Sequence, residues 1–470
     1  MSDVAVAMKT RPVMQPAKSM QGPVSRVISV DFMHGLIMVI MAIDHSRDFL
    51  SNIPFQPEDV AHTFPALFFT RWITHFCAPM FFFLAGTGAY LLRRKTGSVS
   101  ATSRFLWTRG LWLVLLEFTI IEYAWTFVPW QMGGIIWSIG CCMVWMAFLI
   151  HLPDKVTLAF GLTLILFHDL FDRLSPTEFG KFDWLWMMLH HKGVIPHTHF
   201  FVLFPLIPLL GVMALGYVFG KLFDQPPGQR ARMMLLLGAV TTAAFLVLRA
   251  FNAYGNPAAG VAGSSPGQWH PQGTLAMSIV SFLDLEKYPP SLQFLLMILG
   301  PSLILFSVVD RFSPSQLFQR WAHPIVVFGR VPLFFYILHL YAIHFAAILL
   351  AKLSHQPVGW LWKGSFWMNE IPNGYGHGLP VVYLTWFVVI VLLYFPCAWF
   401  AEYKRRHKTW WLRYLVAPNR ELLLPARVER SLAYCLGPNS FASPSRPSSG
   451  ALEGSMRWHG YRVLATAAGS

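Results

Sequence analysis

The sequence predicts an all-α fold, a polytopic bundle of about ten transmembrane helices. Hydrophobic residues make up 55% of the 470 residues and charged residues only 12%, about half of the roughly 25% that is usual in soluble proteins. The mean hydropathy is +0.48, and apolar segments recur along most of the chain. This composition excludes a large water-soluble enzyme, a disordered protein and a fibrous repeat.

A helix needs about 20 apolar residues to cross the hydrocarbon core of a bilayer. The candidate segments are Phe32–Phe49, Trp72–Leu92, Leu111–Phe127, Ile135–Leu152, Val156–Phe171, Phe200–Gly220, Met233–Phe251, Ser291–Val309, Ile325–Ala351 and Pro380–Phe400. The ninth is long enough to tilt or to break at Pro332. An eleventh helix, lying in the interface around Gly359–Met368, is also predicted, because its three Trp suit the boundary between lipid and water.

The polar ends of the chain flank this membrane domain, which we place at residues 26–403. Residues 1–25 lack the continuous apolar core of a signal peptide, so they are expected to form a cytoplasmic tail. Residues 404–470 are basic and rich in Ser, Pro and Gly, which predicts a largely disordered tail. The connections that carry more Lys and Arg then lie inside, which puts both termini in the cytoplasm and the chain in the inner (plasma) membrane.

The charge and the long connections indicate where function is located. The net charge of +14 is explained by basic segments next to an anionic leaflet, and nucleic-acid binding is the weaker interpretation. Three outer connections are long, Asp172–His199, Asn252–Pro290 and Lys352–Leu379, and most of the 18 His fall on that side. Long loops are often functional, so we expect the chemistry near the outer face. The five Cys have no metal-ligand spacing, and no metal site is predicted.

Ionisable side chains at membrane depth form the densest candidate site. They are Asp44, His45, Arg47 and Asp48 at the end of the first segment, with Arg71 and His75 at the start of the second. Burying such a group costs about 2.5–3.5 kcal/mol or more, so each is expected to face a partner or a cavity. A catalytic role is our first interpretation, and an ion-pair knot that fixes two helices is the alternative.

Further polar residues are candidates for binding substrate. They are Glu122, His199, His339 and His344. Each also has a structural alternative: Glu122 could pair with an Arg on another helix, His199 could belong to a solvated loop, and the other two His could be packing residues.

Ordered blocks of residues resemble the heparan-α-glucosaminide N-acetyltransferase-like family of multipass membrane proteins. Residues 26–35 contain Arg26, Asp31, His34 and Gly35 in that family's R-x3–4-D-x-x-[RH]-G pattern. The block Thr74–Gly86, in which Pro79 precedes an aromatic run, resembles the family's second-helix block. The blocks Pro205–Gly216, Lys287–Leu292 and Gly329–His339 fit as well. The resemblance covers roughly residues 26–400.

The resemblance implies transfer of an acetyl group from cytosolic acetyl-CoA to an amino sugar across the membrane. The family uses a His near the outer end of the first core helix or in the following loop. His45 is the first candidate for this role and His62 the second. A pKa near 6.5 would let the imidazole take a proton from the acceptor and return it to the thiolate. Asp44 or Asp48 could then hold its tautomer, and Arg47 or Arg71 could stabilise the oxyanion.

The acetyl-CoA donor would need cations on the inner face. One cluster is Arg93, Arg94, Lys95, Arg104 and Arg109, and another is Lys221, Arg230 and Arg232. The positive-inside rule would place these charges there without any ligand. The other expected partners are the lipid bilayer and a glycan or other outer-face acceptor, and a homodimer is a candidate assembly.

Several alternatives remain open from the sequence. The same Asp, His and Arg residues could form the substrate path of a proton-coupled transporter. A haem-binding electron carrier would need facing His pairs, which only His45 or His75 with His339 or His344 could supply. The acceptor, and the choice between an acetyl-His intermediate and direct transfer, are also open.

Overall fold

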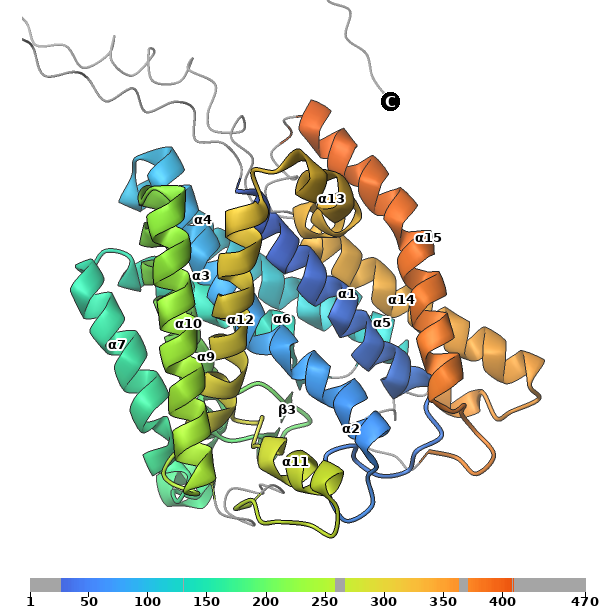
Figure 1. The fold of residues 1–470 in the computed structure, drawn as a ribbon. Coiled ribbons are helices and arrows are strands. Elements are labelled where there is room, and N and C mark those ends of the chain that lie inside the picture. The colour runs from blue at the N-terminus through green and yellow to red at the C-terminus, as the bar shows by residue number, and fades with distance from the viewer. Residues whose placement is uncertain (1–26, 130, 258–266, 363–370, 408, 410–470) are drawn as a thin grey trace, which may run out of the picture. The chain divides into compact units, whose positions relative to one another are not determined.

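A computed structural model describes residues 27–129, 131–257, 267–362, 371–407 and 409 of the chain (Figure 1). The first half contains α1 (Ile28–Leu50), α2 (Pro65–Trp72), η1 (Ile73–Phe76), α3 (Cys77–Thr96), α4 (Val99–Leu116), η2 (Glu117–Ile121), α5 (Glu122–Thr126), α6 (Ile135–Leu149), α7 (Asp154–Phe167), η3 (His168–Phe171), η4 (Pro176–Phe182), α8 (Asp183–His190), α9 (Leu206–Phe219) and η5 (Gly220–Asp224). The second half contains α10 (Pro227–Ala250), α11 (Leu275–Leu283), α12 (Leu292–Phe312), α13 (Gln316–Arg330), α14 (Pro332–Leu353), η7 (Gly359–Trp362) and α15 (Leu379–Arg406). The helical class is therefore confirmed.

Seven helical segments in the described part of the chain are long and apolar enough to cross a membrane. They are Ile28–Leu50, Pro65–Thr96, Leu206–Asp224, Pro227–Ala250, Leu292–Phe312, Pro332–Leu353 and Leu379–Arg406. Helices also occupy the other three predicted segments, as α4 to α5, α6 and α7. The α6 and α7 helices are only 15 and 14 residues long, so a count of about ten crossings stays a prediction.

Large apolar side chains face outward on the outer helices, as expected for a surface in contact with lipid. On α15, Leu384 and Phe395 are 63% and 66% exposed, and on α10 Leu236 is 64% exposed. A soluble protein of this size rarely shows such extended apolar surface. Together with the seven long apolar helices, this identifies a membrane protein.

Local sequence signals explain where several helices begin. Ser98, Thr274, Ser291 and Ser315 precede α4, α11, α12 and α13, and each side chain accepts a hydrogen bond from an amide in the first turn. The α14 helix begins at Pro332, directly after α13 ends at Arg330. The break predicted at Pro332 is confirmed, because proline cannot donate the hydrogen bond that would continue α13.

Glycines allow the central helices to approach at backbone distance. A Cβ atom on Gly35 of α1 would lie 1.8 Å from the Ile325 carbonyl oxygen of α13, and one on Gly329 would lie 1.7 Å from the Asp31 carbonyl oxygen. Such crossings of small residues are typical of membrane helices. Two of the blocks that carry the family resemblance, around Gly35 and Gly329, therefore form one helix crossing.

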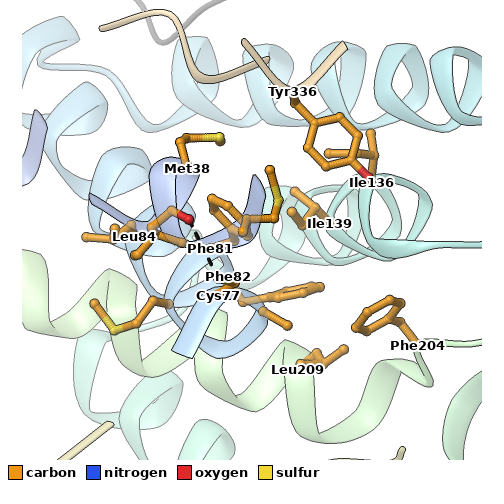
Figure 2. Packing of buried hydrophobic residues seen from close by; sticks show 14 of the residues in the cluster. Met38, Cys77, Phe81, Phe82, Leu84, Ile136, Ile139, Phe204, Leu209 and Tyr336 are labelled. Atoms are coloured by element: carbon orange, nitrogen blue, oxygen red, sulfur yellow. Dashed lines mark hydrogen bonds between the residues drawn. The ribbon is translucent and has the colours of Figure 1, made fainter. Parts of the chain in front are cut away.

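The core between these helices is apolar and aromatic. Met38 of α1, Phe81 and Phe82 of α3, and Leu209 of α9 are at most 7% exposed, and Figure 2 shows how they gather around the start of α3. There the Cys77 thiol donates to the Ile37 carbonyl oxygen over 3.6 Å. The α3 helix thus connects α1 on one side with α9 on the other.

The long connections meet at one end of the bundle, which we call the long-loop end. It holds residues 51–64, 168–205, 251–257, 267–291, 354–362 and 371–378, and α2, α11 and β3 lie there in Figure 1. A small sheet that the sequence did not reveal lies here, with strand order β1 (Met132–Gly133), β3 (Phe201–Val202), β2 (Gly193–Val194). Strand β3 is parallel to β1 and antiparallel to β2. The opposite, short-loop end holds residues 97–98, 150–153 and 313–315.

Some predicted boundaries differ from the structure. The helix predicted from Phe200 begins at Leu206, because Phe201 and Val202 pair in the sheet. The α15 helix runs to Arg406, past the predicted start of the tail at residue 404, and Lys404 is only 3% exposed. Of the predicted interfacial helix, Gly359–Trp362 forms a 3-10 turn and residues 363–368 lie outside the described residues. Residues 1–25 and most of 404–470 also lie outside them.

Candidate functional site

An ion-pair network joins the end of α1 to α2. Arg47 donates through Nη2 to Asp44 Oδ1 over 2.9 Å and also to Asp48. Arg71 of α2 donates through Nη1 to the second oxygen of Asp44. The side chains of Arg47 and Arg71 are 9% and 11% exposed. The predicted clustering of these charges is therefore present, and each guanidinium is paired with two carboxylates.

The second carboxylate on Arg71 comes from Glu58, which the sequence analysis missed. Arg71 Nε donates to Glu58 Oε1 over 2.6 Å, and His75 Nε2 donates to the same oxygen over 3.3 Å. Burial alone would raise the pKa of Glu58, but the Arg71 charge and the His75 hydrogen bond outweigh it and hold that pKa well below its usual value. Glu58 lies in the loop between α1 and α2, where no periodicity marks it as buried.

His45 lies beside this network, facing α5 and α14. Its ring centroid is 4.6 Å from that of Trp125 and 5.2 Å from that of His339. Its Nδ1 is 3.7 Å from Asp48 Oδ2, slightly beyond hydrogen-bond distance, and the described residues leave this buried nitrogen without a partner. Asp44 is held by both arginines, so Asp48 is the carboxylate placed to orient His45.

His339 presents a hydrogen-bond acceptor to the same region. Its Nδ1 is 3.0 Å from the Phe335 carbonyl oxygen, and since a carbonyl only accepts, Nδ1 carries the proton of the neutral ring. The other nitrogen, Nε2, is buried without a partner among the described residues. Because the His45 and His339 rings are in direct contact, a porphyrin plane does not fit between them, and this pair gives no support to the haem alternative.

Two other candidates have structural partners. The ring nitrogens of His344 lie 2.9 Å from the Ala124 carbonyl oxygen and 3.0 Å from that of Leu361, and its ring stacks on Phe49 and Phe127. Glu122 is 3% exposed and accepts from the Met132 amide over 2.8 Å, next to the small sheet. We therefore leave both residues out of the site.

The remaining histidine candidates are at the surface. The His62 side chain is 66% exposed and its Nδ1 contacts Asp59 Oδ2 over 2.7 Å, so the ring faces solvent and not the network. His199 is exposed in the turn before β3. The structure does not bring either of them to His45.

The cations predicted to hold the donor lie at the short-loop end, and two of them are paired within the protein. Arg93 donates to the Tyr217 hydroxyl over 2.5 Å and lies 3.6 Å from Asp154, and Arg94 lies 3.1 Å from Asp224.

The other predicted cations lie nearby. Lys95 follows Arg94 in the last turn of α3, while Arg104 is exposed and Arg109 is half-buried over the Phe105 ring. Since α3 has 20 residues, about 30 Å of helix separates this end from the site near His75.

A second buried group of histidines and aspartates lies at the long-loop end. The sequence predicts only that most histidines fall on this side. His190 Nε2 donates to Asp172 Oδ1 over 3.0 Å, and the His168 ring lies 5.7 Å from the His190 ring. Asp169 accepts from the Leu292 amide over 3.0 Å and so ties η3 to the start of α12. This group therefore stabilises the position of η3 against the start of α12.

Replacing Glu58 with glutamine is expected to lower the free energy of unfolding by about 1–3 kcal/mol at pH 7, because Arg71 and His75 lose a charged acceptor. A depressed carboxyl pKa contributes stability above its usual value of 4.5, and this contribution disappears as pH falls through the lower folded-state pKa. The difference between wild type and Glu58→Gln should therefore shrink below about pH 4.5. Thermal unfolding of both proteins across pH would check this, and a difference that grows at low pH would contradict it.

One protein family matches the part of the chain that contains the ion-pair network. Residues 26–250 match the family described as heparan-alpha-glucosaminide N-acetyltransferase, catalytic. The family resemblance is therefore confirmed for residues 26–250, slightly less than half of the chain. A search of curated proteins finds no match.

The family match covers the network but not the whole bundle. It includes α1 to α10, and with them Asp44, His45, Glu58 and Arg71. Two of the resembling blocks, Lys287–Leu292 and Gly329–His339, lie beyond residue 250. Their resemblance to the family stays a prediction. His339 therefore enters the site through its contact with His45 alone.

Proposed function

We propose that this membrane protein is an acyltransferase that moves an acetyl or related acyl group from cytosolic acyl-CoA to an acceptor at the long-loop end. The acceptor is a glycan or amino sugar, and His45 is the general acid and base. One observation carries the proposal: in the part of the chain that matches this acetyltransferase family, the half-buried His45 has a buried Nδ1 without a partner among the described residues, beside Asp48 and Trp125.

The chemistry follows from the two nitrogens of His45. A small rotation brings Nδ1–H to Asp48 Oδ2, which fixes the tautomer with Nε2 as the base. Nε2 takes the proton from the acceptor hydroxyl or amine as that group attacks the thioester carbonyl. The new C–O or C–N bond forms, the C–S bond breaks, and the proton passes from His45 to the thiolate of CoA.

The arginines and His339 take positioning roles in this scheme. Arg47 and Arg71 each hold two carboxylates, so we assign them to fixing Asp44 and Asp48 and not to the oxyanion. His339 Nε2 accepts a hydrogen bond from a bound substrate. Its ring stacks against Phe335 with centroids 5.1 Å apart, which fixes its direction.

The donor would enter from the short-loop end, where we propose that both chain termini face the cytoplasm. Arg94 and Arg104 are the exposed cations of the predicted cluster among the described residues, and Arg94, like Arg93, is partly neutralised by a carboxylate. Because about 30 Å of helix lies between the two ends, the thioester arm of the donor must extend into the bundle to reach His45.

The direct test follows the acyl group. Membranes that contain the chain are incubated with radiolabelled acetyl-CoA and the labelled product is identified. Label in an acceptor that depends on the chain supports the acyltransferase. Uptake of an unlabelled, unmodified solute without any labelled product would favour the proton-coupled transporter, which uses the same Asp, His and Arg residues as its path.

The proposed orientation predicts which loops are accessible from outside the cell. Gly273 and Gly228 lie at opposite ends of the bundle, and a Cβ on either meets no atom within 4 Å. A membrane-impermeant maleimide should label Gly273→Cys in intact cells and Gly228→Cys only after lysis. Three of the four described native cysteines are buried, which keeps the background low. The reverse pattern would invert the orientation.

A further inference from the structure

A cavity of about 890 Å³ opens at the long-loop end next to the network. Its lining comes from the loop after α1, the sheet, the loop before α11 and the segment before α12, and includes Glu58, Arg71 and Asp284. Arg71 also bonds Asp44, the chain neighbour of His45, so the ion-pair network links the cavity to the proposed reaction centre. Cavities of about 300–1,000 Å³ are typical of small-molecule sites.

One wall of the cavity is fixed by Arg249 from the end of α10. Its guanidinium donates to the carbonyl oxygens of Phe282, Gly267, Ser281 and Asp284 over 2.8–3.2 Å. Arg249 is only 1% exposed. Since its donors are used to hold the loops in shape, Arg249 builds the cavity and does not serve as its ligand group.

Two carboxylates in the cavity lining each have one buried oxygen without a partner among the described residues. They are Oδ1 of Asp284 and Oε2 of Glu58, and Asp284 is 8% exposed. Burying a polar atom without a hydrogen bond is costly, and most such atoms in proteins are satisfied. These two oxygens have almost no exposed surface, so each carboxyl group must turn toward the cavity to accept a hydrogen bond from a ligand.

The charge states of the two groups differ. Burial and the nearby charge of Glu58 raise the pKa of Asp284 to about 8, whereas Glu58 is held ionised by Arg71 and His75. Asp284 can then both donate and accept near neutral pH, while Glu58 only accepts. A ligand group with several N–H or O–H donors matches this pair.

We propose that Asp284 and Glu58 bind the acceptor through hydroxyl or amine groups remote from the acylated atom, in the cavity next to Arg71. The proposal rests on the acyltransferase function and adds the place where the acceptor binds and the residue that selects it. Ionised Glu58 favours a hydrogen-bond donor at its own position, while Arg71, Lys192 and Lys287 in the same lining add positive charge to the cavity.

Binding of a matched pair of sugars to the purified full-length chain tests this. The probes are 4-nitrophenyl β-D-glucosaminide and 4-nitrophenyl β-D-glucoside, which differ only in an amine or a hydroxyl at one position. Asp284→Asn should weaken binding of the preferred probe about tenfold or more, because the O–H donor of the carboxyl group is lost. The preferred probe shows whether the amine or the hydroxyl is recognised.

Asp59→Asn is the matched control, since it makes the same change in the lining of the same cavity. Asp59 already accepts from the Ala61 amide and contacts His62, so binding should change less than twofold. Asp284→Ser removes the carboxyl group altogether and serves as a second variant in case Asp284→Asn does not fold. Thermal unfolding shows whether each variant is folded. Equal affinity in wild type and both Asp284 variants, or no binding of either probe to wild type, overturns the proposed site.

The outcome is separable from that of the proposed function. Where a probe is acetylated, Asp284→Asn should raise its KM and leave kcat within about threefold, because the residue does not touch the reacting atoms. Sugar binding that depends on Asp284 but without any acyl transfer would keep the binding site and refute the acyltransferase. Acyl transfer whose KM does not change in Asp284→Asn would support the acyltransferase and refute the binding site.

Discussion

Replacing His45 with alanine should lower the rate of acyl transfer by about 100- to 10,000-fold, the usual contribution of a general acid and base. The physical reason is that no other imidazole near Asp48 can take the proton from the acceptor. His339 is in ring contact with His45, but its Nδ1 is occupied by the Phe335 carbonyl and it faces no carboxylate partner in the described structure. Transfer of label from radiolabelled acetyl-CoA measures the effect.

The controls separate chemistry from folding. His62→Ala removes the second histidine candidate, which is exposed on the loop after α1, and should retain most of the activity. His45→Gln keeps a polar side chain of similar length and should be as inactive as the alanine variant, with a thermal unfolding temperature near that of wild type. An active His45→Ala together with an inactive His62→Ala would show that His62, in the loop after α1, is the general acid and base.

The membrane part of the fold was predictable because its physical signal is local. All ten apolar segments are mainly helical, with the ninth divided between α13 and α14, since a backbone in lipid must satisfy its own hydrogen bonds. The break at Pro332 also followed from one residue. The short strands at Met132 and Phe201 did not, because two-residue strands depend on a pairing over about 70 positions of chain that no periodicity reports.

The candidate site was predictable in its helical half only. Asp44, Arg47 and Asp48 share a helix face, so spacing brought them together, and charge at membrane depth marked them. Glu58 and Asp284 lie in loops, where acidic residues are common and exposure is expected. Only the folded structure shows that Glu58 is half-buried against Arg71 and that Asp284 is buried next to Arg249. Conversely His62 and His199 looked functional by residue type but lie at the surface.

The crossing of α3 and α9 gives the second large effect. Gly86→Ala should destabilise the protein by at least about 3 kcal/mol, at or above the upper end of ordinary overpacking. A Cβ on Gly86 would lie 2.0 Å from the Met213 carbonyl oxygen and 2.7 Å from the Tyr217 amide nitrogen, both backbone atoms that cannot rotate away. The helices would have to separate, and Thr87 would lose the Gly216 carbonyl, one of its two acceptors, at 3.0 Å.

Gly88→Ala is the matched control, two residues along the same helix. A Cβ there meets no atom within 4 Å, so the substitution should be neutral or stabilise the helix by up to about 1 kcal/mol. Thermal unfolding in detergent compares the two variants. Because α3 directly follows η1, which carries His75, and has Arg93 in its last turn, separating it from α9 would disturb both the network and the short-loop end. Gly86→Ala should therefore lose acyl transfer along with stability, whereas equal behaviour of the two variants would contradict the close crossing of α3 and α9.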